Sequence, residues 1–116
     1  GFGLWAVHLR ATGELLGDCG ITMQQIHGQR LPEIGFHMKK SVWGKGYATE
    51  AAKACLAWGM QQTDFPAFYC YQKSTNLPSR RVSEKLGMTL QEIYADPVNT
   101  FTSVYAITRT EFFAET

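Results

Sequence analysis

The segment that most constrains this chain is a glycine-containing turn that leads directly into an amphipathic helix. Within Val42–Ala52, Gly44 and Gly46 flank a lysine. Small and apolar side chains then recur at helical spacing, which predicts a helix that runs to about Gln61. The preceding run, Glu33–Met38, has the composition of a strand. A strand, a crossover helix and a further strand imply one parallel strand pair in this region.

The turn itself allows two interpretations. Glycines before a helix leave backbone N–H groups unpaired and pointing one way, and together with the helix dipole this arrangement binds phosphate. Glycine is also the default residue of tight structural turns, so spacing alone leaves a plain connection open. The turn is not a dinucleotide-binding fingerprint, because position 49 holds Thr49 where that pattern needs glycine. It is not a P-loop either, because Gly-Lys-Ser/Thr is absent from the sequence.

The rest of the pattern predicts a mixed α/β domain of order βββ-α-β-α-ββ. A second helix is expected to begin after Asn76, a good helix cap, and to end at Gly87, a typical residue after a helix. Early and late hairpins predict antiparallel pairs around the parallel one. The predicted strands cover residues 2–9, 15–25, 31–38, 67–71, 88–94 and 101–109, with loops at 26–30 and 96–100.

The bulk properties exclude several function classes. A hydrophobic content of 45% and a charged content of 18% are typical of a globular domain. The net charge of +1 gives no sign of nucleic-acid binding. The three cysteines lack metal-ligand spacing, so we expect no metal and reduced thiols in a cytoplasmic protein. We expect no membrane association, because no apolar run is long enough to span a bilayer and no signal peptide is visible.

Two segments of the chain resemble the GNAT acetyltransferases, and most closely their Rim-type branch, which includes the ribosomal-protein N-acetyltransferases. The first segment joins Glu33–Met38 to the glycine turn and the start of its helix, and the second covers residues 76–88. The ending Val104–Arg109 also resembles the last strand of that branch. The family commonly has Gln or Arg where this chain has Trp43, whereas the Rim-type branch often has Trp there. The resemblance implies a single GNAT-like domain over residues 1–116, with a central mixed, mostly antiparallel sheet.

The resemblance starts near the family's second strand. The chain is therefore expected to lack the first strand and the helix pair that wall the acceptor site in this family. A fragment, a short gene, or a second chain that completes the wall would each account for this. An apolar face left open by the missing segment would favour a homodimer.

The resemblance also implies acetyl-CoA as the acetyl donor and assigns residues to it. The backbone of the third strand is expected to pair with the pantetheine arm, and the turn amides to hold the pyrophosphate. An N–H near the end of that strand would also hold the oxyanion that develops on the thioester. The expected cofactor-binding residues are Phe36, His37, Met38, Gly44, Lys45, Gly46, Tyr47, Ala48, Thr49 and Asn76.

Two residues are candidates for the chemistry. Glu33 would act as the general base that accepts a proton from the amine, although a glutamate at a strand end is also an ordinary surface residue. Ser79 matches the family serine that faces the sulfur and would protonate the leaving thiolate, although serine also favours helix starts. Tyr71 and Tyr94 are alternative acids. The side chain of His37 is more typical of a structural strand residue.

Three hypotheses follow for the whole chain. The leading one is an N-acetyltransferase that moves an acetyl group from acetyl-CoA to a primary amine by direct transfer. The second is a non-catalytic module that binds an acyl-CoA or a partner chain, and the third is a structural α/β dimer. The acceptor is a protein N-terminus or a small amine, and the fold does not choose between them.

Overall fold

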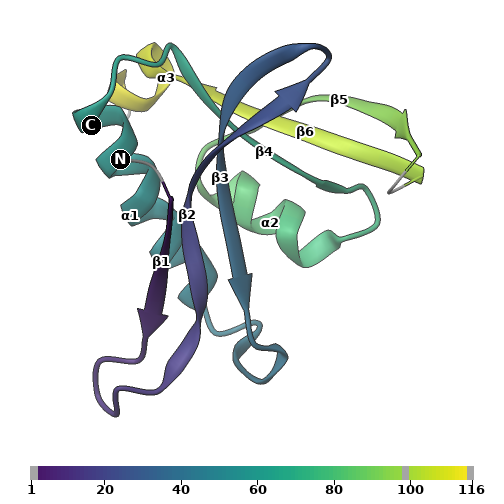
Figure 1. Ribbon diagram of the computed structural model, residues 1–116. Coiled ribbons are helices and arrows are strands. Elements are labelled where there is room, and N and C mark those ends of the chain that lie inside the picture. The colour runs from purple at the N-terminus through teal and green to yellow at the C-terminus, as the bar shows by residue number, and fades with distance from the viewer. Residues whose placement is uncertain (1–2, 98–99, 115–116) are drawn as a thin grey trace.

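The protein forms one six-stranded sheet with helices packed against it (Figure 1). The computed structural model describes residues 3–97 and 100–114. The strands lie in the order β1-β2-β3-β4-β6-β5, and each neighbouring pair is antiparallel except β3 with β4. The bounds of the strands are Gly3–His8 (β1), Leu15–Ile26 (β2), Gln29–Met38 (β3), Ala67–Lys73 (β4), Thr89–Asp96 (β5) and Thr100–Thr108 (β6).

Helical segments follow β3, β4 and β6 along the chain. They are a short 3-10 turn, η1 (Lys40–Val42), and the helices α1 (Tyr47–Gln62), α2 (Leu77–Lys85) and α3 (Arg109–Ala114). The predicted order of six strands and two main helices is confirmed, as is the mixed, mostly antiparallel sheet. The predicted positions at 2 and 98–99 lie outside the described residues. Within the described part of the chain, no helix is both long and apolar enough to cross a membrane.

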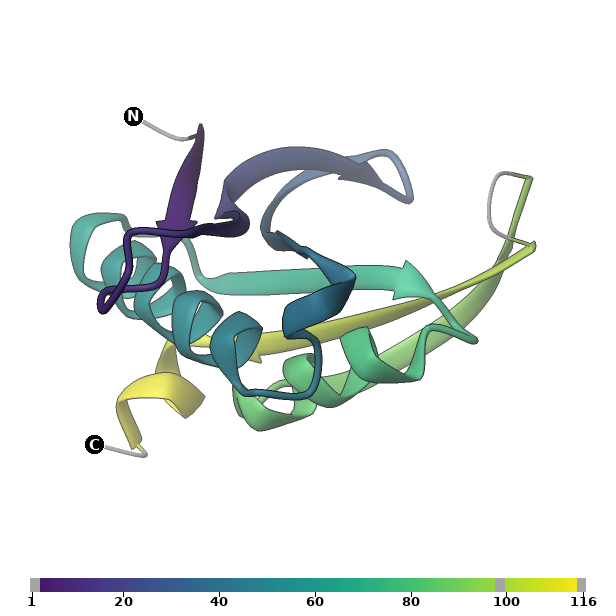
Figure 2. The ribbon, with the colours of Figure 1, turned by 90° about the horizontal axis from the view of Figure 1, so that it is seen from below.

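The main hydrophobic core lies between the sheet and the helices α1 and α2, which cover the same face of the sheet (Figure 2). Successive strand residues point to opposite faces, so alternate residues of β2, β3, β4 and β6 enter this core. At Gly59 the helix comes so close to the sheet that a Cβ would lie 2.6 Å from Cζ of Phe68. The core consists of Cys19, Ile21, Ile34, Ala52, Cys55, Leu56, Met60, Phe68, Cys70, Leu86, Met88, Tyr105 and Ile107.

The sheet splits between its two parallel strands. β3 and β4 are registered at a single position, Glu33 opposite Tyr69. Beyond this point the two strands diverge, and in Figure 1 β3 runs downward while β4 runs to the right. Because β3 and β4 part here, one edge of β3 is left without a neighbouring strand near its C-terminal end.

The β2–β3 hairpin is longer than the sequence suggested. The expected loop at residues 26–30 is only the two-residue turn His27-Gly28, because β2 continues to Ile26 and β3 begins at Gln29. His27 has φ 50° and Gly28 has φ 76°, as the tightest hairpin turns require. Polar side chains at the tip obscured the strand period here.

The tip of this hairpin bends over the sheet face that carries no helix (Figure 2). The His27 Nε2 atom lies 2.7 Å from Oε1 of Glu92 on β5. The rings of His27 and Tyr94, also on β5, have centroids 4.6 Å apart. Nearer the split, the Tyr71 hydroxyl donates a hydrogen bond of 3.0 Å to Oε1 of Gln24. The hairpin therefore arches across β4 and β6 and covers part of the helix-free face.

The final strand begins and ends one residue earlier than predicted, and it is followed by a helix that was not predicted. The prediction ran the strand to Arg109, but β6 ends at Thr108 and α3 follows. The Glu111 N–H donates to Oγ1 of Thr108 (3.1 Å), and the Thr108 N–H donates to Oε1 of Glu111 (2.9 Å). This reciprocal pair is a capping box, and its Thr-x-x-Glu signature was readable in the sequence. The Arg109 guanidinium donates to the carbonyls of Met60 and Thr63 at the end of α1, which ties α3 to that helix.

Candidate active site

A groove of about 710 Å³ runs along the open edge of β3. It brings together three parts of the chain that are far apart in sequence: the end of β3, the glycine turn with the start of α1, and the start of α2. Most of the residues predicted to bind the cofactor lie on it. The lining residues are Phe36, His37, Met38, Val42, Trp43, Gly44, Gly46, Tyr47, Ala48, Thr49, Asn76, Pro78, Ser79, Arg81, Val82 and Lys85.

The glycine turn exposes the start of α1 to this groove. Gly44 has φ 80° and Gly46 has φ 86°, a left-handed conformation that side chains with a Cβ rarely adopt. Gly46 is the residue before the helix, and its carbonyl accepts the first helical hydrogen bond, from the Glu50 N–H at 3.0 Å. The N–H groups of the first helical turn, up to Thr49, therefore have no partner within the helix. Unpaired N–H groups at the positive end of a helix dipole can bind an anion.

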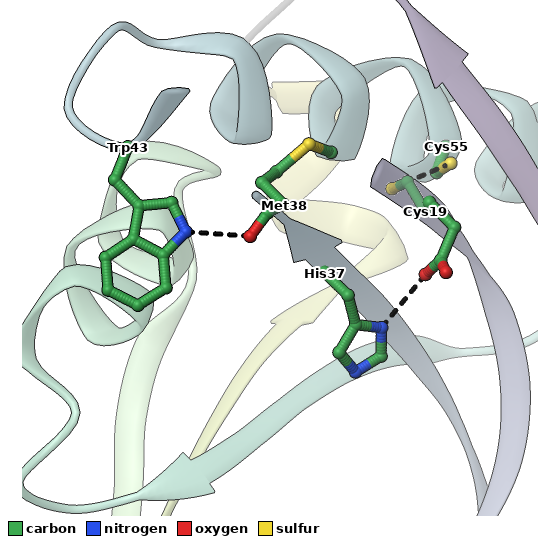
Figure 3. Close-up of polar contacts among 6 residues, drawn as sticks. Cys19, His37, Met38, Trp43 and Cys55 are labelled. Carbon is green, nitrogen blue, oxygen red and sulfur yellow. Dashed lines mark hydrogen bonds and ion pairs between the residues drawn. The ribbon is translucent and has the colours of Figure 1, made fainter. Parts of the chain in front are cut away.

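Trp43 fixes this turn to the strand before it. Its indole Nε1–H donates a hydrogen bond of 2.9 Å to the carbonyl of Met38 (Figure 3). The ring remains 54% exposed and forms part of the groove wall. From the sequence, Trp43 is recognisable only as a family variation, whereas its hydrogen bond to the end of β3 is visible only in the structure.

The backbone of β3 divides its polar groups between its two edges. The Lys39 N–H donates a hydrogen bond of 2.8 Å to the carbonyl of Leu16 in β2. A Cβ built on Gly17, also in β2, would lie 1.9 Å from the carbonyl oxygen of His37. His37 and Lys39 therefore direct their backbone groups toward β2. Because this direction alternates along a strand, Phe36 and Met38 direct theirs toward the open edge. The His37 side chain lines the groove, and its Nδ1 lies 2.9 Å from Oδ1 of Asp18 (Figure 3).

The start of α2 forms the opposite wall of the groove. Asn76 caps this helix, because its Oδ1 accepts a hydrogen bond of 3.3 Å from the Ser79 N–H. The capping interpretation of Asn76 is therefore confirmed, and its side-chain amide nitrogen is a separate group. Ser79 is half-buried and lies on the groove.

Glu33 sits at the point where the sheet splits. Its neighbour Ile34 enters the core, so alternation places the Glu33 side chain on the helix-free face. Its Oε2 accepts a 3.4 Å hydrogen bond from the Tyr71 N–H on β4. Burial raises the pKa of this carboxyl to about 7, although the Tyr71 hydrogen bond and the nearby His37 oppose the shift. A carboxyl with this pKa exchanges protons readily near neutral pH.

Comparisons with known proteins agree with this geometry. Residues 1–89 match the family model for the acetyltransferase (GNAT) domain. The chain belongs to the GNAT acetyltransferase family. It is 44% identical over 88 residues to a Bacillus subtilis (strain 168) protein named YkkB, a match that covers 76% of this chain and 51% of that protein. It is 34% identical over 82 residues to the uncharacterised N-acetyltransferase YnaD of the same organism, covering 71% of this chain and 47% of YnaD. The chain thus spans about half the length of these curated relatives.

Solved structures of this family share the fold. A GNAT-family acetyltransferase from Bacillus anthracis superposes with a TM-score of 0.79 at 27% identity, over 93% of this chain and 67% of that one. The ribosomal L7/L12 acetyltransferase RimL, solved in complex with coenzyme A, superposes with a TM-score of 0.71 at 18% identity, over 83% of this chain and 56% of that one. At that identity the second match shows the fold alone.

The GNAT groove also contains cations that the sequence analysis missed. Arg81 and Lys85 of α2 both line it, whereas the predicted Lys45 is exposed and is not among the lining residues. Arg81 and Lys85 are four residues apart and so share a helix face, two and six positions after Ser79. The spacing of four residues between these two cations, on the same helix as Ser79, was the sequence signal that could have identified them. Among the described residues no group of three or more His, Cys, Asp or Glu side chains could hold a metal ion.

Proposed function

We propose that this GNAT domain transfers an acetyl group from acetyl-CoA to a primary amine. The observation that carries the proposal is the position of Glu33. A carboxyl with a pKa of about 7 stands where the sheet splits, and the open edge beyond the split lines a groove with an anion site. Residues 1–116 would act as one domain.

Acetyl-CoA would bind along the groove. The N–H groups at the start of α1, from Tyr47 to Thr49, would hold the pyrophosphate, and Gly44 and Gly46 permit the turn that presents them. The Phe36 groups that face the open edge would pair with the amides of the pantetheine arm. The Met38 carbonyl, which already accepts from the Trp43 indole, would use its second lone pair for the same arm. His37 would contact the cofactor through its side chain. Asn76 would contribute the amide nitrogen that capping does not use.

Arg81 and Lys85 would add positive charge beside the phosphates of the cofactor. Lys45, at the outer side of the turn, would contribute only a long-range attraction. The residues present therefore fit a long anionic cofactor: backbone donors at one end, an unpaired strand edge in the middle, and cations on the wall.

The reaction would proceed by direct transfer. Glu33 would take a proton from the amine, directly or through one water, and the amine nitrogen would then attack the thioester carbonyl carbon. The Met38 N–H faces the open edge and would stabilise the oxyanion that develops. When the carbon–sulfur bond breaks, the Ser79 hydroxyl would protonate the departing thiolate of coenzyme A.

The acceptor would approach from the helix-free face, because that is the side on which Glu33 lies. There the Tyr71–Gln24 hydrogen bond forms a polar surface next to the carboxyl. Trp43 supports a place in the Rim-type branch, for which a protein N-terminus is one acceptor class and a small amine the other. A homodimer could complete the wall around the acceptor.

The test is the release of free coenzyme A from acetyl-CoA in the presence of a panel of amines and of short peptides with free N-termini. We expect saturable release with at least one acceptor, together with a rise in melting temperature on adding acetyl-CoA. Binding of acetyl-CoA without turnover on any acceptor would instead favour the non-catalytic acyl-CoA module. No thermal shift at millimolar acetyl-CoA would overturn both interpretations.

A further inference from the structure

Two cysteine side chains from different elements meet away from the cofactor groove. The Sγ atoms of Cys19 on β2 and Cys55 on α1 lie 3.2 Å apart, and both residues are free thiols (Figure 3). Cys19 is 1% exposed and Cys55 is 8% exposed. The pair is part of the core, but it lies at the edge of that core.

A second groove, of about 390 Å³, is lined in part by both cysteines. Trp5 and Trp58 on its wall are 43% and 37% exposed, and their rings meet edge to face with centroids 5.6 Å apart. The third cysteine, Cys70, does not line this groove and donates its hydrogen bond to the Ile34 carbonyl. The groove has no charged side chain and is lined by Trp5, Ala6, Val7, Cys19, Ala51, Ala54, Cys55 and Trp58.

The contact between the two thiols makes them chemically different. The hydrogen bond from Cys19 stabilises the thiolate of Cys55 and lowers the pKa of Cys55, against the effect of burial. The same contact, together with burial, raises the pKa of Cys19. Because the thiolate is the nucleophile, Cys55 would react first with an incoming oxidant. Cys19 then has the position of a resolving thiol.

We propose that Cys19 and Cys55 form an oxidation site, where a hydroperoxide that enters the tryptophan-walled groove converts the two thiols to a disulfide. The Cys55 thiolate attacks the terminal peroxide oxygen, the O–O bond breaks, and the departing alkoxide or hydroxide takes a proton from solvent to leave as an alcohol or water. The Cys19 sulfur then attacks the sulfenic sulfur of Cys55, the S–O bond breaks, and water leaves with the Cys19 proton. The two thiols lose two electrons, and the hydroperoxide gains them.

The geometry favours this product and this class of oxidant. A disulfide has an S–S distance of about 2.05 Å, so the sulfurs need to approach by only roughly 1 Å. An uncharged peroxide can enter an apolar groove, whereas glutathione disulfide would have to bury charged groups without partners. The product would link α1, which carries the anion site, to β2 at a position directly opposite Phe36.

The test is oxidation of the reduced 116-residue chain with hydrogen peroxide, with glutathione disulfide as the parallel oxidant. Free thiols are then alkylated under denaturing conditions, and the protein is cut with trypsin and with a protease that cleaves before aspartate. Cleavage before Asp64 separates Cys55 from Cys70. We expect peroxide to join the Cys19 and Cys55 peptides with the loss of two hydrogens, reversibly with dithiothreitol. Glutathione disulfide should leave both cysteines alkylated.

Two variants make the assignment specific. Cys70→Ser should form the same cross-link to the same extent, because Cys70 does not line the groove. Cys19→Ser should leave Cys55 as a sulfenic acid that dimedone traps. Full alkylation of the wild-type chain after peroxide, a cross-link that involves Cys70 or a second chain, or a glutathione adduct on Cys55 would each overturn the proposal. These outcomes are measured on the wild-type chain and do not depend on a variant folding.

Discussion

The two sides of the split between β3 and β4 present different kinds of chemical group, backbone N–H groups on one side and a carboxyl side chain on the other. On the groove side, the proposed anion site consists of backbone N–H groups at an exposed helix start, with glycines that permit the turn. On the helix-free side, the proposed chemistry depends on one side chain, Glu33, whose pKa is raised by burial. A backbone site tolerates many side-chain changes as long as its dihedral angles are kept, whereas a site made by one buried carboxyl has no substitute. Mutations should therefore separate cofactor binding from chemistry.

The largest effect is expected from Glu33→Gln, which keeps the shape and removes the base. General-base catalysis is worth roughly 10²–10⁴-fold, so kcat should fall by about 10³-fold. The affinity for acetyl-CoA, measured by calorimetry, should stay within about twofold of wild type, because Glu33 lies outside the groove lining. A loss of cofactor affinity as large as the loss of kcat would show that the two sides are not separable.

The rate should also report the titration of Glu33. The base must be deprotonated, so kcat/KM is expected to rise about tenfold per pH unit below pH 7 and to level off above it. Two acceptors of different amine pKa serve as the control, because only the limb set by the enzyme stays in place when the acceptor changes. A limb near pH 4.5, the ordinary value for glutamate, would contradict the shifted pKa.

The same shift predicts a pH dependence of stability. The folded protein holds the Glu33 proton up to about pH 7, whereas the unfolded chain releases it near 4.5. The unfolding free energy that this proton contributes is complete below pH 4.5 and is lost as the pH rises to 7. We expect a loss of roughly 3 kcal/mol in denaturant unfolding across this window. The matched variant Glu33→Gln should show a flatter curve, and identical slopes would refute the assignment.

On the groove side, Gly46→Val should weaken acetyl-CoA binding by about tenfold. A β-branched residue at φ 86° costs roughly 1–2 kcal/mol and disturbs the turn that presents the N–H groups. Gly13→Val is the matched control, since Gly13 has φ 74° and open space around it but lies in the β1–β2 turn. Both variants should lose stability, but only Gly46→Val should lose affinity in a titration.

The smallest effect is expected from the cations. Arg81→Ala should raise the Kd for acetyl-CoA about threefold at low salt, and less at high salt, because exposed charge pairs are weak and screened. Lys45→Ala should change the Kd by less than this, since Lys45 does not line the groove. Equal effects of the two substitutions would indicate that Lys45 binds the cofactor, as the sequence predicted.

The local features were predictable from the sequence because each is determined by neighbours along the chain. The glycine turn, the start of α1 and the Asn76 cap depend on residues within one helical turn, and all three are present. The order of elements followed from hydrophobic period and turn residues. The Thr108–Glu111 capping box was equally local, so α3 was missed although its signal was there.

What the tertiary structure decided depends on residues that are distant in sequence. The raised pKa of Glu33 comes from burial at a split that β4 creates, and from a hydrogen bond to Tyr71, 38 residues away. Arg81 lines the groove and Lys45 does not, because of how α2 lies relative to the end of β3. The Cys19–Cys55 contact likewise joins a strand to a helix 36 residues on. The hydrophobic period of the sequence determines on which face of its own strand or helix a residue lies. Only tertiary packing determines which other elements that face contacts and how far water is excluded from the contact.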